Sequence, residues 1–308
     1  MNTMPLLEAR EVNQFLGGNR VISDLSISVP QGGVYGFLGR NGAGKSTVMK
    51  ILLGLLQPET GEVFMSGRPI STKDKQYLSR IGSLIEEPSF YPNLTGAENI
   101  RYISRIRKTP SHEDRLLKLV GLSEQANKKA GAYSLGMKQR LGIALALVGD
   151  PDLLLLDEPT NGLDPEGIRE IRQLILHFSR EMGKTVLVSS HILSEIEHIA
   201  DVVGIIHHGR IRYEGPLQNL SGEASLVLDP LDEEQAKHAL LSEGIRFRDL
   251  GDKTLSLPYQ GREDSAYLIN HLVNRGVEVA SLKVEKRTLE DSFLAMTGER
   301  NIASVQGV

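Results

Sequence analysis

The chain has 308 residues, of which 40% are hydrophobic and 24% charged, and these ordinary values exclude a largely disordered protein. Its length predicts one large domain and one small domain. The formal net charge of -4 gives no electrostatic reason to expect nucleic acid as a partner, and the lack of cysteine excludes disulfides and thiolate metal sites.

The first 220 residues alternate short apolar runs with helical patterns. Leu7–Val12 and Leu25–Val29 alternate like strands of an antiparallel, half-exposed sheet. Buried strands are predicted at Val34–Leu38, Ile81–Ile85, Leu153–Leu156 and Thr185–Ser189, and helices at Lys45–Leu55, Thr95–Arg107, Gly136–Val148 and Pro165–Arg180. This alternation favours an α/β domain with a largely parallel sheet. The strand-free stretch after Thr95 predicts an inserted helical subdomain at about 95–150.

A different pattern begins after the Gly215-Pro216 pair. Strands are predicted at Ser225–Leu228, Arg246–Leu250, Thr254–Leu257 and Glu278–Val284, and helices at Glu233–Ser242, Arg262–Asn274 and Thr288–Met296. The order β-α-β-β-α-β predicts a small α+β, ferredoxin-like domain. We therefore divide the chain into a domain at 1–220 and an accessory domain at 221–308, in which no catalytic motif is found.

No segment is expected to cross a membrane. The most apolar windows, near 141–148 and 153–156, are separated by Gly149, Asp150 and Asp152, whereas a spanning helix needs about 20 apolar residues. The N-terminus has no cationic segment before an apolar one, so a secretory signal is not expected either. These features predict a soluble or peripheral chain.

A phosphate-binding loop lies between a predicted strand and a predicted helix. The run Gly39-Arg-Asn-Gly-Ala-Gly-Lys-Ser46 matches the pattern G-x-x-x-x-G-K-[S/T]. Its glycines let consecutive amide N–H groups point at phosphate oxygens, and the helix adds its positive end. Lys45 would bridge the β- and γ-phosphates, and Ser46 would offer its hydroxyl to Mg²⁺. The candidate nucleotide site is Gly39, Arg40, Asn41, Gly42, Ala43, Gly44, Lys45, Ser46 and Thr47.

Two carboxylates follow the apolar run at 153–156. Asp157 can hold Mg²⁺, usually through water, on the side opposite Ser46. Glu158 can then polarise the water that attacks the γ-phosphate, as a general base does. Kinases, GTPases, helicases and transport ATPases all share a phosphate loop, so the downstream motifs must distinguish them.

The run Tyr133-Ser-Leu-Gly-Met-Lys-Gln-Arg140 resembles the signature motif of ABC-type ATPases. In that family this serine and glycine, here Ser134 and Gly136, contact the γ-phosphate of ATP bound to the opposite subunit. Leu135 stands where the commonest form has glycine, and Met137 where it often has glutamine. Without the other motifs, an ordinary serine helix cap would be the better interpretation.

Two further motifs carry the same resemblance. Asn161-Gly-Leu-Asp164 resembles the D-loop, which aligns the two subunits, and the resemblance places Asp164 near the nucleotide. His191 ends an apolar run and occupies the position of the switch histidine that contacts the γ-phosphate. A lone histidine is more often structural, which is what we expect of the others at 177, 198, 207 and 208.

Glu86 stands where the family usually has a glutamine that contacts Mg²⁺ and water. Glutamate can also ligate Mg²⁺, but its charge changes the metal affinity and its pH dependence. The run from Pro88 to Asn99 resembles ABC proteins associated with bacitracin and lantibiotic export or self-protection. That subgroup tends to carry Glu at this position, a Ser-Leu-Gly-Met-Lys-Gln signature and an extra C-terminal domain that ends near a segment like that at 289–294.

Recognition of the adenine base is left open. The family stacks an aromatic residue on adenine near the first strand, and Phe15 is the nearest candidate. One extra residue before Asp24 shifts the alignment, so Leu16 takes that place in the alternative. A core or hairpin role for Phe15 is equally favoured.

The resemblance implies an ATPase that converts ATP and water to ADP and phosphate, with Mg²⁺ as cofactor. Two copies, or this chain and a relative, would sandwich two ATP molecules, with separate membrane permease subunits contacting the groove at 86–91. The chain would then lie peripherally on the cytoplasmic face of the membrane and power export, for example of an antimicrobial peptide. A soluble ABC ATPase outside transport, or a regulatory ATPase of a membrane complex, stays open as the alternative.

Overall fold

The computed structural model describes residues 4–70, 76–220, 224–259 and 261–286, together with Leu289, Ser292, Phe293 and Met296. The chain divides into two compact units, Met1–Leu217 and Gln218–Val308. Among the described residues, no helix combines the length and the apolar character needed to span a bilayer.

The large sheet of the first unit is mainly parallel. Its order is β10-β9-β3-β8-β7-β6, and only β10 runs antiparallel to its neighbour. The strands are β3 (Val34–Leu38), β6 (Ile81–Leu84), β7 (Leu153–Asp157), β8 (Thr185–Ser190), β9 (Val202–His207) and β10 (Arg210–Pro216). Parallel neighbours need crossover connections, which place helices on both faces. In such sheets ligands bind at the carboxyl ends of the strands.

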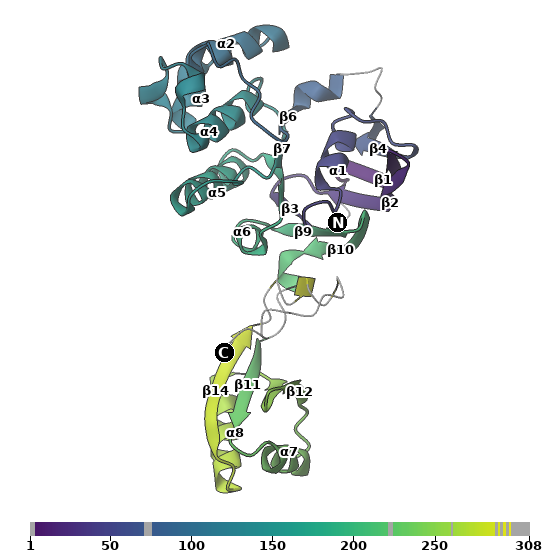
Figure 1. Ribbon diagram of the computed structural model, residues 1–308, viewed down its shortest axis with the longest axis vertical. Coiled ribbons are helices and arrows are strands. Elements are labelled where there is room, and N and C mark those ends of the chain that lie inside the picture. Colours follow the sequence, from purple (N-terminus) through teal and green to yellow (C-terminus); the bar gives the residue numbers. More distant parts are fainter. Residues whose placement is uncertain are drawn as a thin grey trace. The chain divides into compact units, whose positions relative to one another are not determined.

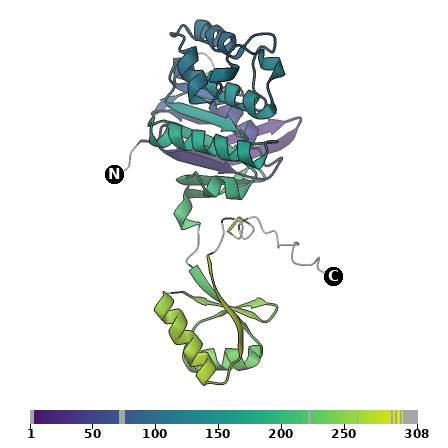
Figure 2. The ribbon, with the colours of Figure 1, turned by 90° about the vertical axis from the view of Figure 1, so that its left-hand side faces the viewer.

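Helices cover both faces of this sheet, as predicted. Helix α1 (Lys45–Leu52) lies on one face, whereas α5 (Pro165–Arg180) and α6 (Leu193–Glu197) lie on the other (Figure 1). In Figure 2 α5, drawn in teal, lies in front of this sheet. Asp164 caps α5 and Pro165 occupies its first turn, which explains why this helix begins where the sequence predicts.

A helical group follows β6 in the chain and precedes β7, its neighbour in the sheet. It contains α2 (Gly96–Arg107), α3 (Glu113–Leu119) and α4 (Leu135–Ala146), which Figure 1 shows together. Thr95 and Glu98 form a capping box at the start of α2. Short 3-10 turns occupy Gln76–Arg80, Ser123–Gln125, Ala130–Ala132 and Leu217–Asn219.

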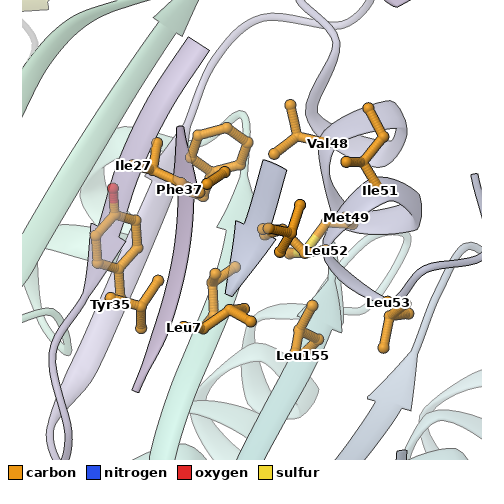
Figure 3. Close-up of a cluster of buried hydrophobic side chains, with 14 of the residues drawn as sticks. Leu7, Ile27, Tyr35, Phe37, Val48, Met49, Ile51, Leu52, Leu53 and Leu155 are labelled. Carbon is orange, nitrogen blue, oxygen red and sulfur yellow. The ribbon is translucent and has the colours of Figure 1, made fainter. Parts of the chain in front are cut away.

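An antiparallel sheet packs on the α1 side of the first unit. It has the order β2-β1-β4-β5, with β1 (Leu7–Leu16), β2 (Asn19–Val29), β4 (Thr60–Met65) and β5 (Arg68–Pro69). Figure 3 shows the core between this sheet, α1 and the central strands, where Ile27, Phe37, Met49 and Leu52 are at most 1% exposed. This core fixes α1, and therefore the loop that precedes it, against β3.

The second unit has the ferredoxin-like arrangement that the sequence predicts. Its elements are β11 (Ala224–Pro230), α7 (Glu233–Ser242), β12 (Arg248–Gly251), β13 (Thr254–Pro258), α8 (Arg262–Asn274) and β14 (Val279–Lys286). The antiparallel sheet has the order β12-β13-β11-β14. Leu226, Leu255, Leu240 and Leu272 form its core between one sheet face and the two helices. The helix predicted at 288–296 falls mostly outside the described residues.

Some predicted boundaries were wrong. Helix α1 ends at Leu52 rather than Leu55, because the backbone turns at Gly54, whose φ is +64°. The first two strands are longer than predicted and form a hairpin around Gly17 and Gly18. Strands β4, β9 and β10 were not predicted. In β10 exposed and half-buried positions alternate, and charged residues alternate with uncharged ones, so the strand contains no continuous apolar run.

Replacing Gly82 of β6 with alanine is expected to destabilise the first unit by about 3 kcal/mol. A Cβ atom there would lie 2.0 Å from the carbonyl oxygen of Ala146 at the end of α4. Urea unfolding of the full chain measures the effect, with Ser83→Ala on the exposed neighbouring position as control. Equal unfolding midpoints for the two variants would contradict the close packing of α4 on β6.

Candidate active site

The loop between β3 and α1 leaves backbone donors free for an anion. The first helical hydrogen bond runs from Val48 N to Gly44 O, so the amides at 45–47 precede the helical ladder. No side chain caps α1, whereas Thr95 and Ser134 cap α2 and α4. Positive φ angles of 80° at Gly42 and 108° at Gly44 produce the turn. The loop therefore presents N–H groups at a positive helix end.

Neighbouring strands hold this loop closely. A Cβ atom on Gly39 would lie 2.7 Å from Ile206 Cγ2 and 2.8 Å from Ile206 O, and one on Gly44 would lie 2.7 Å from Ile22 Cδ1. The amide of Gly209 also donates to Ala43 O at 3.1 Å. The glycines at 39 and 44 are thus required by packing against β9 and β2, and Gly44 is also required by its positive φ.

Lys45 lies buried within the loop, with 5% of its side chain exposed. Its ammonium Nζ donates to Gly39 O at 2.7 Å and to Arg40 O at 3.3 Å. The same Nζ lies 3.0 Å from Glu158 Oε1. The structure thus joins the lysine of the phosphate loop directly to the second carboxylate of the acidic pair.

Glu158 is held between two basic side chains. Its Oε1 contacts Lys45, and its Oε2 lies 2.7 Å from His191 Nδ1. Burial alone would raise the pKa of Glu158, but the hydrogen bonds and charges of Lys45 and His191 outweigh it, so the pKa lies below its ordinary value. Glu158 is therefore a carboxylate at neutral pH.

Strand register explains this meeting of distant residues. Asp157 of β7 pairs with Ser189 of the parallel neighbour β8, so the residues that follow each strand lie at the same edge. Glu158 adopts a φ of 46° immediately after β7, a backbone strain often stored at functional sites. His191 follows β8 directly.

Ser189 is a site residue that the sequence analysis missed. Its Oγ donates to Asp157 Oδ1 at 2.5 Å and accepts from Glu158 N at 3.0 Å, and the residue is fully buried. It thereby fixes both members of the acidic pair. The only sequence signal was its place beside the histidine, in the run Val188-Ser-Ser-His191.

The predicted metal-binding residues share one cavity of about 590 Å³, which Ser46, Glu86, Asp157 and Glu158 help to line. A hydroxyl and carboxylates are the hard oxygen ligands that Mg²⁺ prefers. Asp157 is 3% exposed and keeps one carboxylate oxygen beyond its bond to Ser189. Among the described residues no group of three or more acidic or histidine side chains forms a closed metal cage. A hydroxyl and carboxylates that line an open cavity leave room for the water and phosphate ligands that Mg²⁺ usually keeps.

Glu86 has a partner that the sequence analysis did not anticipate. Its Oε1 lies 2.6 Å from Lys50 Nζ, and Lys50 follows Ser46 by one helical turn on α1. The lysine thus offsets the charge that glutamate adds to the cavity. Glu86 is thereby bound to α1.

Replacing Lys50 with methionine is expected to weaken ATP binding in the absence of Mg²⁺ by about threefold, the scale of an exposed ion pair. The unpaired Glu86 would repel the triphosphate, so Lys50→Met combined with Glu86→Gln should restore the wild-type affinity. Equilibrium binding of a fluorescent ATP analogue to the wild type, the single variants and the double variant measures these effects. Arg80→Met is the matched control, because Arg80 pairs with Asp152 at the same 2.6 Å with similar exposure. Additive effects in the double variant would argue against the coupling.

The signature residues lie at the exposed start of α4. Ser134 caps this helix by accepting from Met137 N at 3.3 Å, and Leu135 is 47% exposed. A Cβ atom on Gly162 would lie 3.2 Å from Leu135 Cδ2, so the D-loop run at 161–164 lies beside the signature. Within the described part of the chain, no hydrogen bond joins Ser134 to the phosphate loop.

Two other predicted nucleotide contacts have local partners. Asp164 caps α5, since its Oδ1 accepts from Gly167 N at 3.2 Å. Phe15 lies in the β1–β2 hairpin, 40% exposed, with the guanidinium of Arg20 6.0 Å from its ring centroid. Leu16 is similarly exposed at 44%. Ile22, farther along the same hairpin, contacts the phosphate loop at Gly44.

Known proteins resemble this chain in sequence and in fold. Residues 22–161 match the family model described as ABC transporter. The chain is 39% identical to the bacitracin transport ATP-binding protein BcrA of Bacillus licheniformis, over 95% of this chain and 97% of that protein. It is 44% identical to the lantibiotic transport ATP-binding protein SrtF of Streptococcus pyogenes, over 68% of this chain and 90% of that protein. The solved structure of cbiO1 from Clostridium perfringens, part of the ABC transporter complex cbiONQ, superposes with a TM-score of 0.64 at 29% identity, covering 70% of this chain and 90% of that chain.

Proposed function

The chain belongs to the ATP-binding proteins of ABC transporters, a family that hydrolyses ATP to drive transport, and from this premise we propose which of its residues perform hydrolysis and what it transports. The observation that carries the proposal is Glu158, which is held between Lys45 and His191 at the carboxyl edge of the sheet. The same edge carries the phosphate loop.

Lys45 changes its partner when ATP binds. In the structure Lys45 neutralises Glu158; when ATP occupies the loop, its ammonium would contact the β- and γ-phosphates, which are the stronger anion. Glu158 Oε1 is then released to accept a proton from the attacking water. His191 keeps Oε2 in place and faces the γ-phosphate. Activation of the base is in this way coupled to occupancy of the loop.

Ser46 and Asp157 would hold Mg²⁺, with Glu86 as a third oxygen donor at the same cavity. When bound there, the ion would neutralise charge on the phosphates and orient them. Ser189 orients Asp157 and the backbone of Glu158 together. A shift of Ser189 would therefore disturb both the metal site and the base.

Ser134 and Gly136 complete the site from a second ATP-binding subunit. They sit at an exposed helix end, and no hydrogen bond among the described residues ties Ser134 to its own phosphate loop. A small hydroxyl and a positive helix end suit the γ-phosphate. ATP would thus lie between Gly39–Thr47 of one subunit and Ser134–Gly136 of the other. Asp164 and Phe15 contribute to the subunit contact and to the adenine contact.

The transport process is export of an antimicrobial peptide of the bacitracin or lantibiotic class, through separate permease subunits. The chain would lie on the cytoplasmic face of the membrane. Support comes from the likeness to a bacitracin transport protein over nearly the whole chain, which includes the C-terminal unit. The permease, rather than this chain, would select the peptide.

Growth of the source cells with and without this chain tests the peptide class. Loss of the chain is expected to lower the inhibitory concentration of bacitracin or of a lantibiotic at least ~10-fold, since an ATPase without activity leaves transport unpowered. A complementing copy should restore resistance, and Lys45→Met should fail to restore it. Unchanged sensitivity to every peptide of this class would refute the assignment, while leaving the ATPase assignment intact.

A further inference from the structure

The sheet of the C-terminal unit has two unequal edges. At one edge β12 has four residues, and its Asp249 lies 2.8 Å from Lys237. At the other edge β14 has eight residues, and Figure 1 shows it on the outer side of β11. In the part of the chain that the structure describes, no strand pairs with this outer side. A long free edge presents backbone groups with which a further strand can pair.

Exposed apolar side chains of α8 flank this edge. Leu272 is buried in the core, and His271 lies 3.4 Å from Glu243 at the end of α7. Because successive helical residues are 100° apart, Ile269 and Val273 lie on the flank that faces away from α7. They are 38% and 55% exposed. Helix α8 contacts β14, so this flank overlooks the free edge.

Val284 extends the apolar surface onto the strand itself. It pairs with Leu226 of β11 and therefore points to the helix-covered side of the sheet, where Leu226 is buried. Val284 is nevertheless 51% exposed, because it lies beyond the cover of the helices. It is an apolar side chain directly beside unpaired backbone groups.

The charges on the opposite face of β14 are self-complementary. Lys283 and Glu285 are exposed there, and neither has an ion-pair partner among the described residues. A two-fold axis through Val284 would set the strand antiparallel to itself in a second copy. Each Lys283 would then lie opposite the Glu285 of the other copy, and the two Val284 side chains would meet at the axis. Opposite charges across paired strands stabilise the pair, and a two-fold contact counts every such pair twice.

We propose that the C-terminal units of two copies of this chain pair through β14, with Val284 opposite Val284, so that one continuous antiparallel sheet crosses both copies. The paired strands bury the two Val284 side chains against each other on the helix side. This contact needs no nucleotide, so it holds the two ATP-binding subunits together throughout the hydrolysis cycle. It goes beyond the proposed function, because it involves none of the residues of the nucleotide site.

A single cysteine tests the pairing and its register. The chain contains no cysteine, so Val284→Cys introduces the sole thiol. Directly opposed residues of antiparallel strands have Cα atoms about 4.5–5.5 Å apart, within the range of a disulfide. Mild oxidation of the nucleotide-free full chain should therefore produce a covalent dimer. Leu241→Cys, on an exposed position of α7, is the control for random collision and should form no covalent dimer. A Val284→Cys chain that cross-links no faster than this control would overturn the proposal.

Reversing these charges tests whether the strand that pairs with β14 belongs to a second copy of the chain. Lys283→Glu and Glu285→Lys should each weaken nucleotide-free dimerisation about tenfold in Kd, because each places like charges opposite each other twice. Mixing the two variants should restore dimers, as should the doubly reversed chain. Sedimentation of the full chain measures dimerisation of the two single variants, their mixture and the doubly reversed chain. Single variants that dimerise like the wild type, or a mixture that stays monomeric, would exclude this register, whatever the result for ATP hydrolysis.

Discussion

Glu158→Gln is expected to slow ATP hydrolysis at least ~100-fold, as removal of a positioned general base does. The amide keeps the shape of the side chain and its contact with His191, but it cannot accept the proton of the attacking water. ATP affinity should stay equal to that of the wild type or increase, because Lys45 no longer has a competing carboxylate 3.0 Å away. Single-turnover hydrolysis and equilibrium ATP binding measure the two effects separately.

The matched control for this experiment is Glu124→Gln, an exposed glutamate of the same unit. It should hydrolyse ATP at the wild-type rate. If Glu158→Gln retained turnover, Glu158 would not be the base. If Glu158→Gln lost ATP binding as well as turnover, the ion pair between Glu158 and Lys45 would support the structure of the loop, and Glu158 would not compete with the phosphates for Lys45.

Lys45→Met is expected to weaken ATP binding about 100-fold. The charged hydrogen bonds to the β- and γ-phosphates are lost, each of which contributes about 1.5–3 kcal/mol, and Glu158 stays near the triphosphate without the ammonium that neutralised its Oε1. Calorimetric titration with Mg·ATP measures the affinity. The stability of the nucleotide-free chain should also fall, since Glu158 loses the partner that lowers its pKa.

Lys184→Met is the matched control for the loss of a buried lysine. Lys184 is 7% exposed, lies 2.7 Å from Asp150 and donates to Pro151 O at 2.6 Å, so its surroundings are similar to those of Lys45. This variant should lose stability but keep its ATP affinity. Equal loss of affinity in both variants would mean that Lys45 acts through folding rather than through the phosphates.

The phosphate loop, Asp157, Glu158 and His191 could be predicted because each lies at the end of an apolar strand of recognisable length. Parallel strands bring their carboxyl ends to one edge, so even the grouping of these residues follows from chain order. The helices Glu233–Ser242 and Arg262–Asn274 were also predicted with their observed limits. A capping Asp232 before the first of them is a local signal.

The roles of Ser189 and Lys50 could not be predicted in this way. Ser189 bridges Asp157 and Glu158 only because of the register between β7 and β8, which is set by the whole sheet. Lys50 reaches Glu86 across 36 residues, and an exposed helical lysine has no pattern that marks it. The limits of β12 were missed for a related reason, since an edge strand with exposed residues lacks a buried face that would define its period.

The most direct test of the whole account is to tag this chain, solubilise native membranes gently and identify what co-purifies. The account predicts a stoichiometric protein with several membrane-spanning segments, and an ATPase activity of the complex that Glu158→Gln removes without dissociating it. Recovery of the chain from the cytosol alone, with soluble or ribosomal partners, would contradict its assignment to a transporter.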